Sequence, residues 1–231
     1  MEEIKILYED EYLIICVKPR AVLSQRDESG DPCMTELLEK LYLERGKRQY
    51  IGLVHRLDRN VSGVMLFSKR KDITGKLSEL IKNRDFTKEY LAVVQGIFED
   101  KSGSMEDILF FDRFSSKTFA VDRERKGAKK ASLDFSVIGE MRTDKGDFSL
   151  VKVRLNTGRT HQIRAQFSKR NHPIAGDGKY GSKINCQIAL FSYRLSFIHP
   201  VTKKTVDVSY APDFGDFPVP NTKPFSGPAK N

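Results

Sequence analysis

Short apolar runs alternate with polar turns along most of the chain, and they predict a mixture of strands and helices. Runs at 4–8 and 12–17 read as two strands, because β-branched and aromatic residues suit a pleated, half-buried surface. Leucines spaced three and four apart after Asp31 predict a helix that Asp31 caps and Gly46 ends. A second amphipathic helix is expected over 72–83.

The remaining apolar runs read as strands, at 51–57, 64–68, 88–98, 133–138, 148–155 and 189–198. Strands and helices that do not alternate in a strict βαβ order indicate an α+β fold. The pattern continues without a linker, so we expect one domain over residues 1–210. Residues 211–231 hold five of the nine prolines and little apolar pattern, which predicts an extended or disordered C-terminal tail.

The chain is basic. Its 231 residues include 40 Lys and Arg against 31 Asp and Glu, a net charge of +9, and such an excess favours polyanionic partners, nucleic acid ahead of membrane. The charge is densest over 113–130, with seven Lys or Arg against two acids. Arg123, Arg125 and Lys126 are therefore candidates for an RNA-contacting arm, and a solvated hairpin or loop is the alternative.

Cysteine and histidine content bears on metals and on the compartment. Three cysteines form no CxxC pair and four histidines form no HxxH pair, which argues against a disulfide framework and against a metal site. The charged N-terminus is unlike a signal peptide, and no apolar run approaches the roughly 20 residues that span a bilayer. We expect a cytoplasmic monomer without a membrane partner.

Candidate chemistry begins with VHRLDRNVSG, residues 54–63. Asp58 lies there between Arg56 and Arg59, at a strand end or in a loop, where functional residues are common. Taken alone, Asp58 could equally be a turn residue or a structural ion pair.

A second stretch, NTGRTHQIRAQF at 156–167, combines a turn signal with a helix start near Thr160. Arg159, His161 and Arg164 lie where the helix dipole favours an anion. In one interpretation the planar fork of Arg164 reaches a carboxylate. In the other, Arg164 is a surface residue and His161 a capping residue.

These stretches and KEYLAVVQG at 88–96 resemble, in this order, the H-R-L-D-R-x-T-S-G, K-x-Y-x-A-x-V-x-G and T-G-R-x-H-Q-I-R blocks of the RluA-type pseudouridine synthases. LYEDEYLIICVKP, HPIAGDGKYG and LSFIHP resemble further family blocks, so the resemblance covers about residues 4–210. It implies a mixed, largely antiparallel sheet with flanking helices and a central basic cleft. Because the opening block starts at residue 4, no N-terminal S4-like domain is expected.

The resemblance also implies residue roles. The family's catalytic aspartate falls on Asp58, its active-site tyrosine on Tyr90 and the basic partner of the aspartate on Arg164. Arg56 matches the residue implicated in displacing the target base from the RNA. Further RNA contacts are expected from Arg59, Arg159 and His161.

The implied reaction breaks the N1–C1′ bond of a uridine and rejoins the uracil through C5, so it needs no cofactor. Asp58 must be ionised to act as a nucleophile at C1′ or a base at C2′, and a nearby arginine lowers a carboxyl pKa by about 1–3 units. Tyr90 would offer an apolar surface to the unstacked uracil, with a buried strand tyrosine as the alternative.

Two other functions are compatible with a basic chain. A non-catalytic RNA-binding protein on the same scaffold would have no use for a carboxylate facing phosphates. A nuclease would need a carboxylate cluster for two metal ions, and the sequence has none. Whether the RNA is ribosomal or transfer RNA stays open, and DNA is not expected.

Three positions depart from the family pattern. Val61 replaces a usual threonine, Ala21 a usual glycine, and Phe191-Ser192 a common His-Ala. The change at Ala21 bears on the backbone, because alanine tolerates a positive φ poorly.

Overall fold

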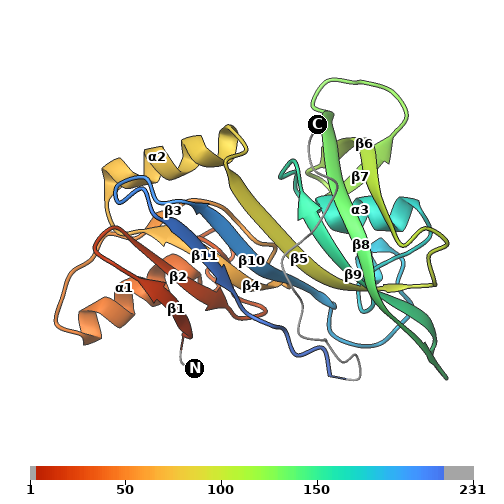
Figure 1. Ribbon diagram of the computed structural model, residues 1–231, viewed down its shortest axis with the longest axis horizontal. Helices are drawn as coiled ribbons and strands as arrows, with labels where there is room; N and C mark the ends of the chain where they lie inside the picture. Colours follow the sequence, from red (N-terminus) through yellow and green to blue (C-terminus); the bar gives the residue numbers. More distant parts are fainter. Residues whose placement is uncertain (1–3, 216–231) are drawn as a thin grey trace. The chain divides into compact units, whose positions relative to one another are not determined.

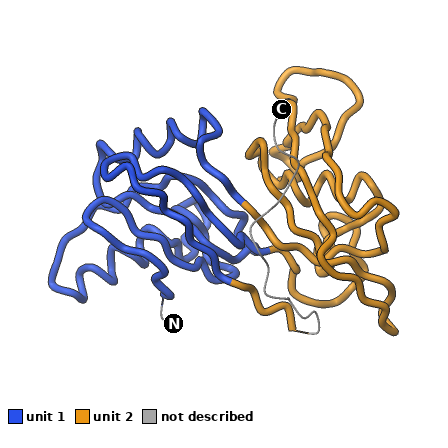
Figure 2. The backbone as a smooth tube through the Cα atoms, viewed as in Figure 1, with its two compact units in different colours: residues 1–88, 191–210 blue, residues 89–190, 211–231 orange. Residues whose placement is uncertain are grey.

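The computed structural model describes residues 4–215, and the chain divides into two compact units (Figures 1 and 2). The first unit comprises residues 1–88 and 191–210, and the second comprises residues 89–190 and 211–231. The predicted tail lies largely outside the described residues, from 216 onward. A single domain over 1–210 stays a prediction.

The first unit is built on a sheet with one parallel pair. Its strands follow the order β1, β2, β4, β10, β11, and the short β3 also pairs with β4. Only the β4–β10 pair is parallel among these pairs, and the others are antiparallel. The bounds are β1 (Ile6–Glu9), β2 (Leu13–Lys18), β3 (Gly52–Leu53), β4 (Ser62–Ser68), β10 (Leu190–Ile198) and β11 (Thr205–Ser209).

Two helices complete this unit, α1 (Met34–Glu44) and α2 (Lys71–Lys82). Ile73 and Leu77 on α2 join a buried cluster with apolar residues of β2, β4, β10 and β11. The predicted helix over 72–83 is confirmed, because its apolar stripe is the face that this sheet covers. Segments from both ends of the sequence therefore share one core (Figure 2).

The start predicted for the first helix was wrong. Leu23 donates its N–H to the carbonyl of Pro32 (3.0 Å) and accepts from Met34 (2.8 Å), so the chain stays extended through Cys33 and the helix begins after it. Asp31 pairs with Arg59 at 2.8 Å instead of capping the helix. Gly46 ends the helix as predicted, with a φ of 74° that glycine adopts without strain.

The second unit holds an antiparallel sheet in the order β5, β9, β8, β6, β7. Its strands are β5 (Phe86–Gln95), β6 (Ser102–Asp112), β7 (Lys117–Val121), β8 (Lys129–Thr143) and β9 (Gly146–Leu155). Helix α3 (Gln162–Lys169) and the 3₁₀ turn η1 (Gly178–Tyr180) belong to the same unit. The α+β prediction with a mostly antiparallel sheet is confirmed.

One buried carboxylate ties α3 to the sheet. Asp107 on β6 accepts from Gln166 (2.7 Å), Lys169 (2.9 Å) and Arg170 (2.8 Å). Burial would raise the pKa of Asp107, but these donors outweigh it and hold the pKa below its ordinary value. The C-terminal half of α3 is thereby fixed on β6.

Three strands were missed from the sequence, β6, β7 and β11, and the predicted strand over 51–57 shortens to β3. Residues 113–130 form the turn of the β6–β7 hairpin, β7 itself, the connection to β8 and the first two residues of β8. Whether they contact RNA stays a prediction. No helix among residues 4–215 is long and apolar enough to cross a membrane.

Candidate active site

Asp58 lies in the irregular segment between β3 and β4, as the sequence predicted. Its neighbours on both sides are fixed by buried polar side chains. Ser24 Oγ donates to the carbonyl of Leu57 (2.9 Å) and accepts from the Leu57 N–H (3.0 Å), and Lys18 Nζ donates to the carbonyl of Arg59 (3.1 Å). The partly exposed carboxylate therefore stands on a backbone clamped one residue before it and one after.

Lys18 was not identified from the sequence, although it ends the apolar run of β2. It is fully buried, and its ammonium also donates to the carbonyls of Pro19 (2.8 Å) and Val22 (2.6 Å). Burial lowers the pKa of Lys18 to about 7, while the negative charge of Asp58 acts to raise it. The position of Lys18 at the end of a strand does not by itself show that the side chain is buried or that it faces a candidate carboxylate.

The turn after Lys18 keeps the geometry that the family glycine would give. Ala21 has a φ of 62°, a left-handed conformation that costs an alanine energy. The carbonyls that Lys18 binds come from Pro19 and Val22, on either side of Ala21. The lysine thus holds a strained turn in place.

The other departures are absorbed by packing within the first unit. Val61 is buried, and its N–H donates to the Asp58 carbonyl at 3.0 Å. Ser192 Oγ donates to the carbonyl of Val64 at 3.0 Å. Both contacts are made to backbone carbonyls near Asp58. Asp58 still lies in the segment where the sequence predicted it.

The basic neighbours of Asp58 differ in their surroundings. Arg56 and Arg59 are exposed, and Arg59 pairs with Asp31. His55 is buried, and its Nε2 accepts from the N–H of Leu66 at 3.1 Å. Burial lowers the pKa of His55 to about 3, with the nearby Lys88 charge acting in the same direction, so at neutral pH this ring is a neutral structural acceptor.

Arg164 lies in the first turn of α3, within the second unit. Its Nε donates to Asp177 Oδ2 (2.7 Å) and its Nη2 to Asp177 Oδ1 (2.8 Å). The two side chains are only 8% and 2% exposed, so this is a buried, bidentate pair. Asp177 lies in the HPIAGDGKYG block, but the sequence does not predict its role, because nothing local links position 177 to position 164.

The aromatic ring of Tyr180 packs against the guanidinium of Arg164. The guanidinium carbon of Arg164 lies 4.8 Å from the centre of the Tyr180 ring, within cation–π range. The Tyr180 hydroxyl accepts from the N–H of Thr118 (2.8 Å) and lies 2.9 Å from His161 Nδ1. His161 has a φ of 51° and directly precedes α3, so the helix begins two residues later than expected.

Two other predicted residues of this unit lie apart from Arg164, Tyr90 on a strand and Arg159 in the connection between β9 and α3. Tyr90 lies on β5 opposite Val153 and is 6% exposed. Arg159 is exposed, and its Nε donates to the carbonyl of Lys130 at 3.0 Å.

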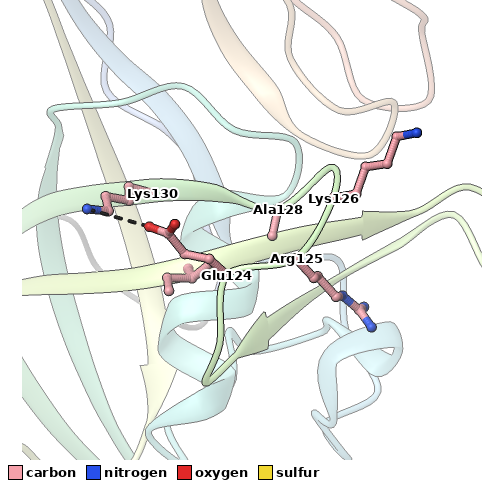
Figure 3. Close-up of a pocket in the computed structure, with 6 residues that line it drawn as sticks. Glu124, Arg125, Lys126, Ala128 and Lys130 are labelled. Atoms are coloured by element: carbon pink, nitrogen blue, oxygen red, sulfur yellow. Dashed lines mark ion pairs between the residues drawn. The ribbon is translucent and has the colours of Figure 1, made fainter.

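The basic segment forms the exposed connection from β7 to β8. Figure 3 shows Glu124 and Lys130 reaching toward each other, while Arg125 and Lys126 point away from that pair. Glu124 and Lys130 lie 3.6 Å apart. Arg123, Arg125 and Lys126 are all exposed, as an arm that meets a polyanion requires.

The predicted residues are thus grouped by unit. Arg56, Asp58 and Arg59 share one segment of the first unit. Arg164 and His161 meet at Tyr180 in the second unit, which also contains Tyr90 and the basic arm. The predicted pairing of Asp58 with Arg164 joins residues of different units and stays a prediction.

Comparison with known proteins decides the family. The model of the RNA pseudouridylate synthase family matches residues 12–169. The chain belongs to this family. It is therefore an isomerase that acts on uridine in RNA.

Individual pseudouridine synthases show how far the similarity extends. The tRNA pseudouridine synthase C of Haemophilus influenzae is 32% identical over 225 residues, covering 89% of this chain and 92% of that protein. The ribosomal large subunit pseudouridine synthase C of Buchnera aphidicola is 32% identical over 220 residues, covering 90% and 67%.

The solved structure of human RNA Pseudouridylate Synthase Domain Containing 4 matches with a TM-score of 0.75 at 23% identity. It covers 91% of this chain and 89% of that one, and this likeness supports the pseudouridine synthase fold.

Proposed function

We propose that this enzyme isomerises specific uridines in structured ribosomal or transfer RNA, with Asp58 as its catalytic carboxylate. The single observation that supports the assignment most strongly is the clamped segment at Asp58, within the stretch that matches the family model. A carboxylate on a fixed backbone can be held at one distance from a ribose, which is the positioning that nucleophilic or base catalysis needs.

The identity of the RNA is argued from relatives. One relative is named for tRNA and others for the large ribosomal subunit, so both substrates fit the family. A net charge of +9 suits either polyanion. We place the enzyme in the cytoplasm as a monomer, in the compartment where both classes of RNA are used in translation.

Arg164 is the proposed partner that keeps Asp58 ionised. Asp177 occupies the Nε–Nη2 edge of its guanidinium, and an arginine has a second donor edge formed by its two Nη atoms. Because Asp177 fixes the plane of the guanidinium, the proposed contribution of Arg164 is a donor in a fixed orientation.

The remaining roles are proposed from the family resemblance and, for the cations, also from their exposure. Tyr90 is the proposed surface for the displaced uracil. Arg56 is the proposed side chain that displaces the base, and the exposed cations Arg59, Arg159, Arg123, Arg125 and Lys126, with His161, are the proposed RNA contacts. No residue in this scheme needs a metal or a cofactor.

The decisive experiment is Asp58→Asn, which removes a charge without changing the side-chain size. Tritium release from RNA labelled at uridine C5 should fall below detection, because asparagine is neither a nucleophile nor a base. RNA affinity in a filter-binding assay should be kept or rise, since a negative charge facing phosphates has gone. Asp85→Asn, at an exposed carboxylate of the same unit, serves as the control and should keep full activity. Substantial tritium release by Asp58→Asn would remove Asp58 from this role.

A further inference from the structure

The hairpin formed by β6 and β7 has two unlike faces. Cross-strand partners project to the same side of a sheet. On one side, Leu109 and its partner Ala120 pack with Ala131 of β8, Ala165 and Tyr180, so this face supports the Arg164 site. On the other side, Phe110 stands opposite Phe119.

The Phe110–Phe119 side is an aromatic surface that remains open. Phe119 is 42% exposed, and Phe110, Ile108 and Val121 are partly exposed. Ile108 pairs with Val121 on one side and with Lys130 on the other, which places these side chains on the same face as the two rings. We call Ile108, Phe110, Phe119 and Val121 the outer face of the hairpin. A contiguous exposed apolar surface on a folded protein marks an interaction site.

A cation lies directly over this outer face, because the guanidinium carbon of Arg125 is 3.6 Å from the centre of the Phe110 ring. Lys117 Nζ lies near both faces, 5.5 Å from the centre of the Phe119 ring and 5.1 Å from that of Tyr180. A turn with the Ala128 N–H donating to the Arg125 carbonyl (2.9 Å) orders the segment that carries Arg125. A groove of about 520 Å³ opens beside it, lined by Ile108, Glu124, Arg125, Lys126, Ala128 and Lys130 (Figure 3).

This combination of chemistry selects a particular kind of ligand. Aromatic rings and guanidinium planes offer stacking surfaces to bases of any identity, and neighbouring lysines neutralise the backbone. A base can use such a surface only if it is unstacked and unpaired. An RNA duplex instead presents phosphates and 2′-hydroxyls, with its bases enclosed. A protein ligand, in contrast to an unpaired base, would need only an apolar surface and no cation over each ring.

We propose that the outer face of the hairpin binds an unpaired nucleotide of the substrate RNA, with the base stacked on Phe119 and the phosphates near Arg125, Lys126 and Lys130. This proposal rests on the proposed function and adds to it a substrate class, which is RNA with a single-stranded segment beside the target uridine. The inner face of the same hairpin packs against Tyr180, which contacts Arg164. A flanking base bound on the outer face could therefore set the position of the RNA relative to the Arg164 site.

The chain contains no tryptophan, so Phe119→Trp introduces one reporter at the predicted stacking position. Adding a single-stranded oligouridylate should quench its emission in a saturable way, because a stacked base contacts the indole. A duplex RNA of the same length should quench it little. Tyr50→Trp places the reporter at an exposed aromatic position of the other unit (46% exposed), and it should not respond to either RNA.

A second variant measures the contribution to binding. Phe119→Ala should weaken the oligouridylate about 10-fold, the order of one lost stacked base, and leave the duplex affinity unchanged. Phe119→Trp should retain wild-type affinity for the single strand. Thermal melting of each variant reports whether the hairpin still folds, and the Trp variant tests the stacking even if the Ala variant is unstable.

Several results would overturn the proposal. Saturable RNA binding without quenching of the indole emission of Phe119→Trp would place the base elsewhere, and equal loss of single-strand and duplex affinity would reduce this face to general electrostatics. Binding of a protein partner that RNA does not displace would assign the face to that partner. Tritium release by the wild-type enzyme is scored separately, so a failure of the stacking surface leaves the isomerase assignment standing, and the reverse also holds.

Discussion

Lys18, near the candidate carboxylate Asp58, and Arg164, itself a candidate catalytic residue, are both buried basic side chains, but the protein holds them in opposite ways. Lys18 in the first unit is surrounded by three backbone carbonyls, from Pro19, Val22 and Arg59. Arg164 in the second unit is held by the carboxylate of Asp177 through two parallel hydrogen bonds.

The difference lies in what each contact positions. Carbonyl acceptors belong to the backbone, so Lys18 fixes the course of the chain on both sides of a turn and next to Asp58. A bidentate carboxylate fixes the plane of the guanidinium itself, so Asp177 orients the side chain of Arg164. The first arrangement supports a segment that carries a functional group, and the second supports the functional group directly.

The largest expected effect comes from Asp177→Asn, which keeps the side-chain size and removes the charge. Breaking a buried pair by removing one partner costs about 3–5 kcal/mol of unfolding free energy, because the buried guanidinium of Arg164 loses the charge of Asp177. Turnover should fall more than RNA affinity does, since the orientation of Arg164 is lost while the exposed cations remain. Chemical denaturation and tritium-release kinetics measure the two effects.

Asp207→Asn is the matched control for that variant. Asp207 also binds an arginine through two oxygens, those facing Arg194 Nε and Nη2, but its side chain is 42% exposed. An exposed pair contributes about 0–1 kcal/mol, and turnover should not change. Equal losses in the two variants would show that bidentate geometry alone, without burial, explains the result.

The next effect in size is expected for Lys18→Met, which replaces the ammonium with an apolar end of similar length. Three buried carbonyls lose their donor, and an unsatisfied buried group costs about 1–3 kcal/mol. RNA affinity should be nearly unchanged while turnover falls, because the segment at Asp58 loses an anchor.

The same variant has a pH signature. The pKa of Lys18 is lowered to about 7 in the folded protein from 10.5, so between these values the unfolded chain binds the extra proton. Stability of the wild type should therefore rise from pH 7 toward pH 10 relative to Lys18→Met, and the difference should be constant below pH 7. A flat difference across the whole range would mean that Lys18 stays fully charged in the folded state.

The smallest effect is expected at the turn that Lys18 holds. Ala21→Gly removes the cost of a positive φ but adds freedom to the unfolded chain, so stability should rise by only about 0.5 kcal/mol. Ala128→Gly, at a residue without a positive φ, should lower stability by a similar amount. A loss of stability in both variants would show that Ala21 is unstrained in its turn.

The fold and part of the site could be predicted from the sequence because the signals are local. The apolar stripe of α2, the glycine that ends α1 and the segment around Asp58 each depend on neighbouring residues. Strand β6 was missed because its first half, SGSMED, has Met105 as its only apolar side chain besides glycine, and its pairing partners lie in later parts of the chain. The start of α1 was misplaced because a bridge from Leu23 competes with the capping pattern.

The partners within the candidate site could not be predicted for the same reason. Asp177 lies 13 residues from Arg164 and sits in a glycine-rich turn that could face any direction. Lys18 follows an apolar run, and the sequence does not show that its end is enclosed. In the sequence, Asp177 is an acid between two glycines and Lys18 is a lysine at the end of a buried strand. Neither pattern identifies the residue that the side chain binds.

The first unit is formed by two separate stretches of the chain, and this affects how it folds during synthesis on the ribosome. Its sheet pairs β4 with β10, and its core includes Leu195, Phe197 and Val206, so residues translated early must wait for residues 191–210. At about 5–20 residues per second, the wait after β4 is on the order of ten seconds, and the sheet strands of the second unit all emerge within it. Nascent chains arrested with residue 190 outside the ribosome should therefore resist protease over 89–155 while residues 12–82 are still cut. Protection of the earlier segment at that length would show that it forms a stable core without β10 and β11.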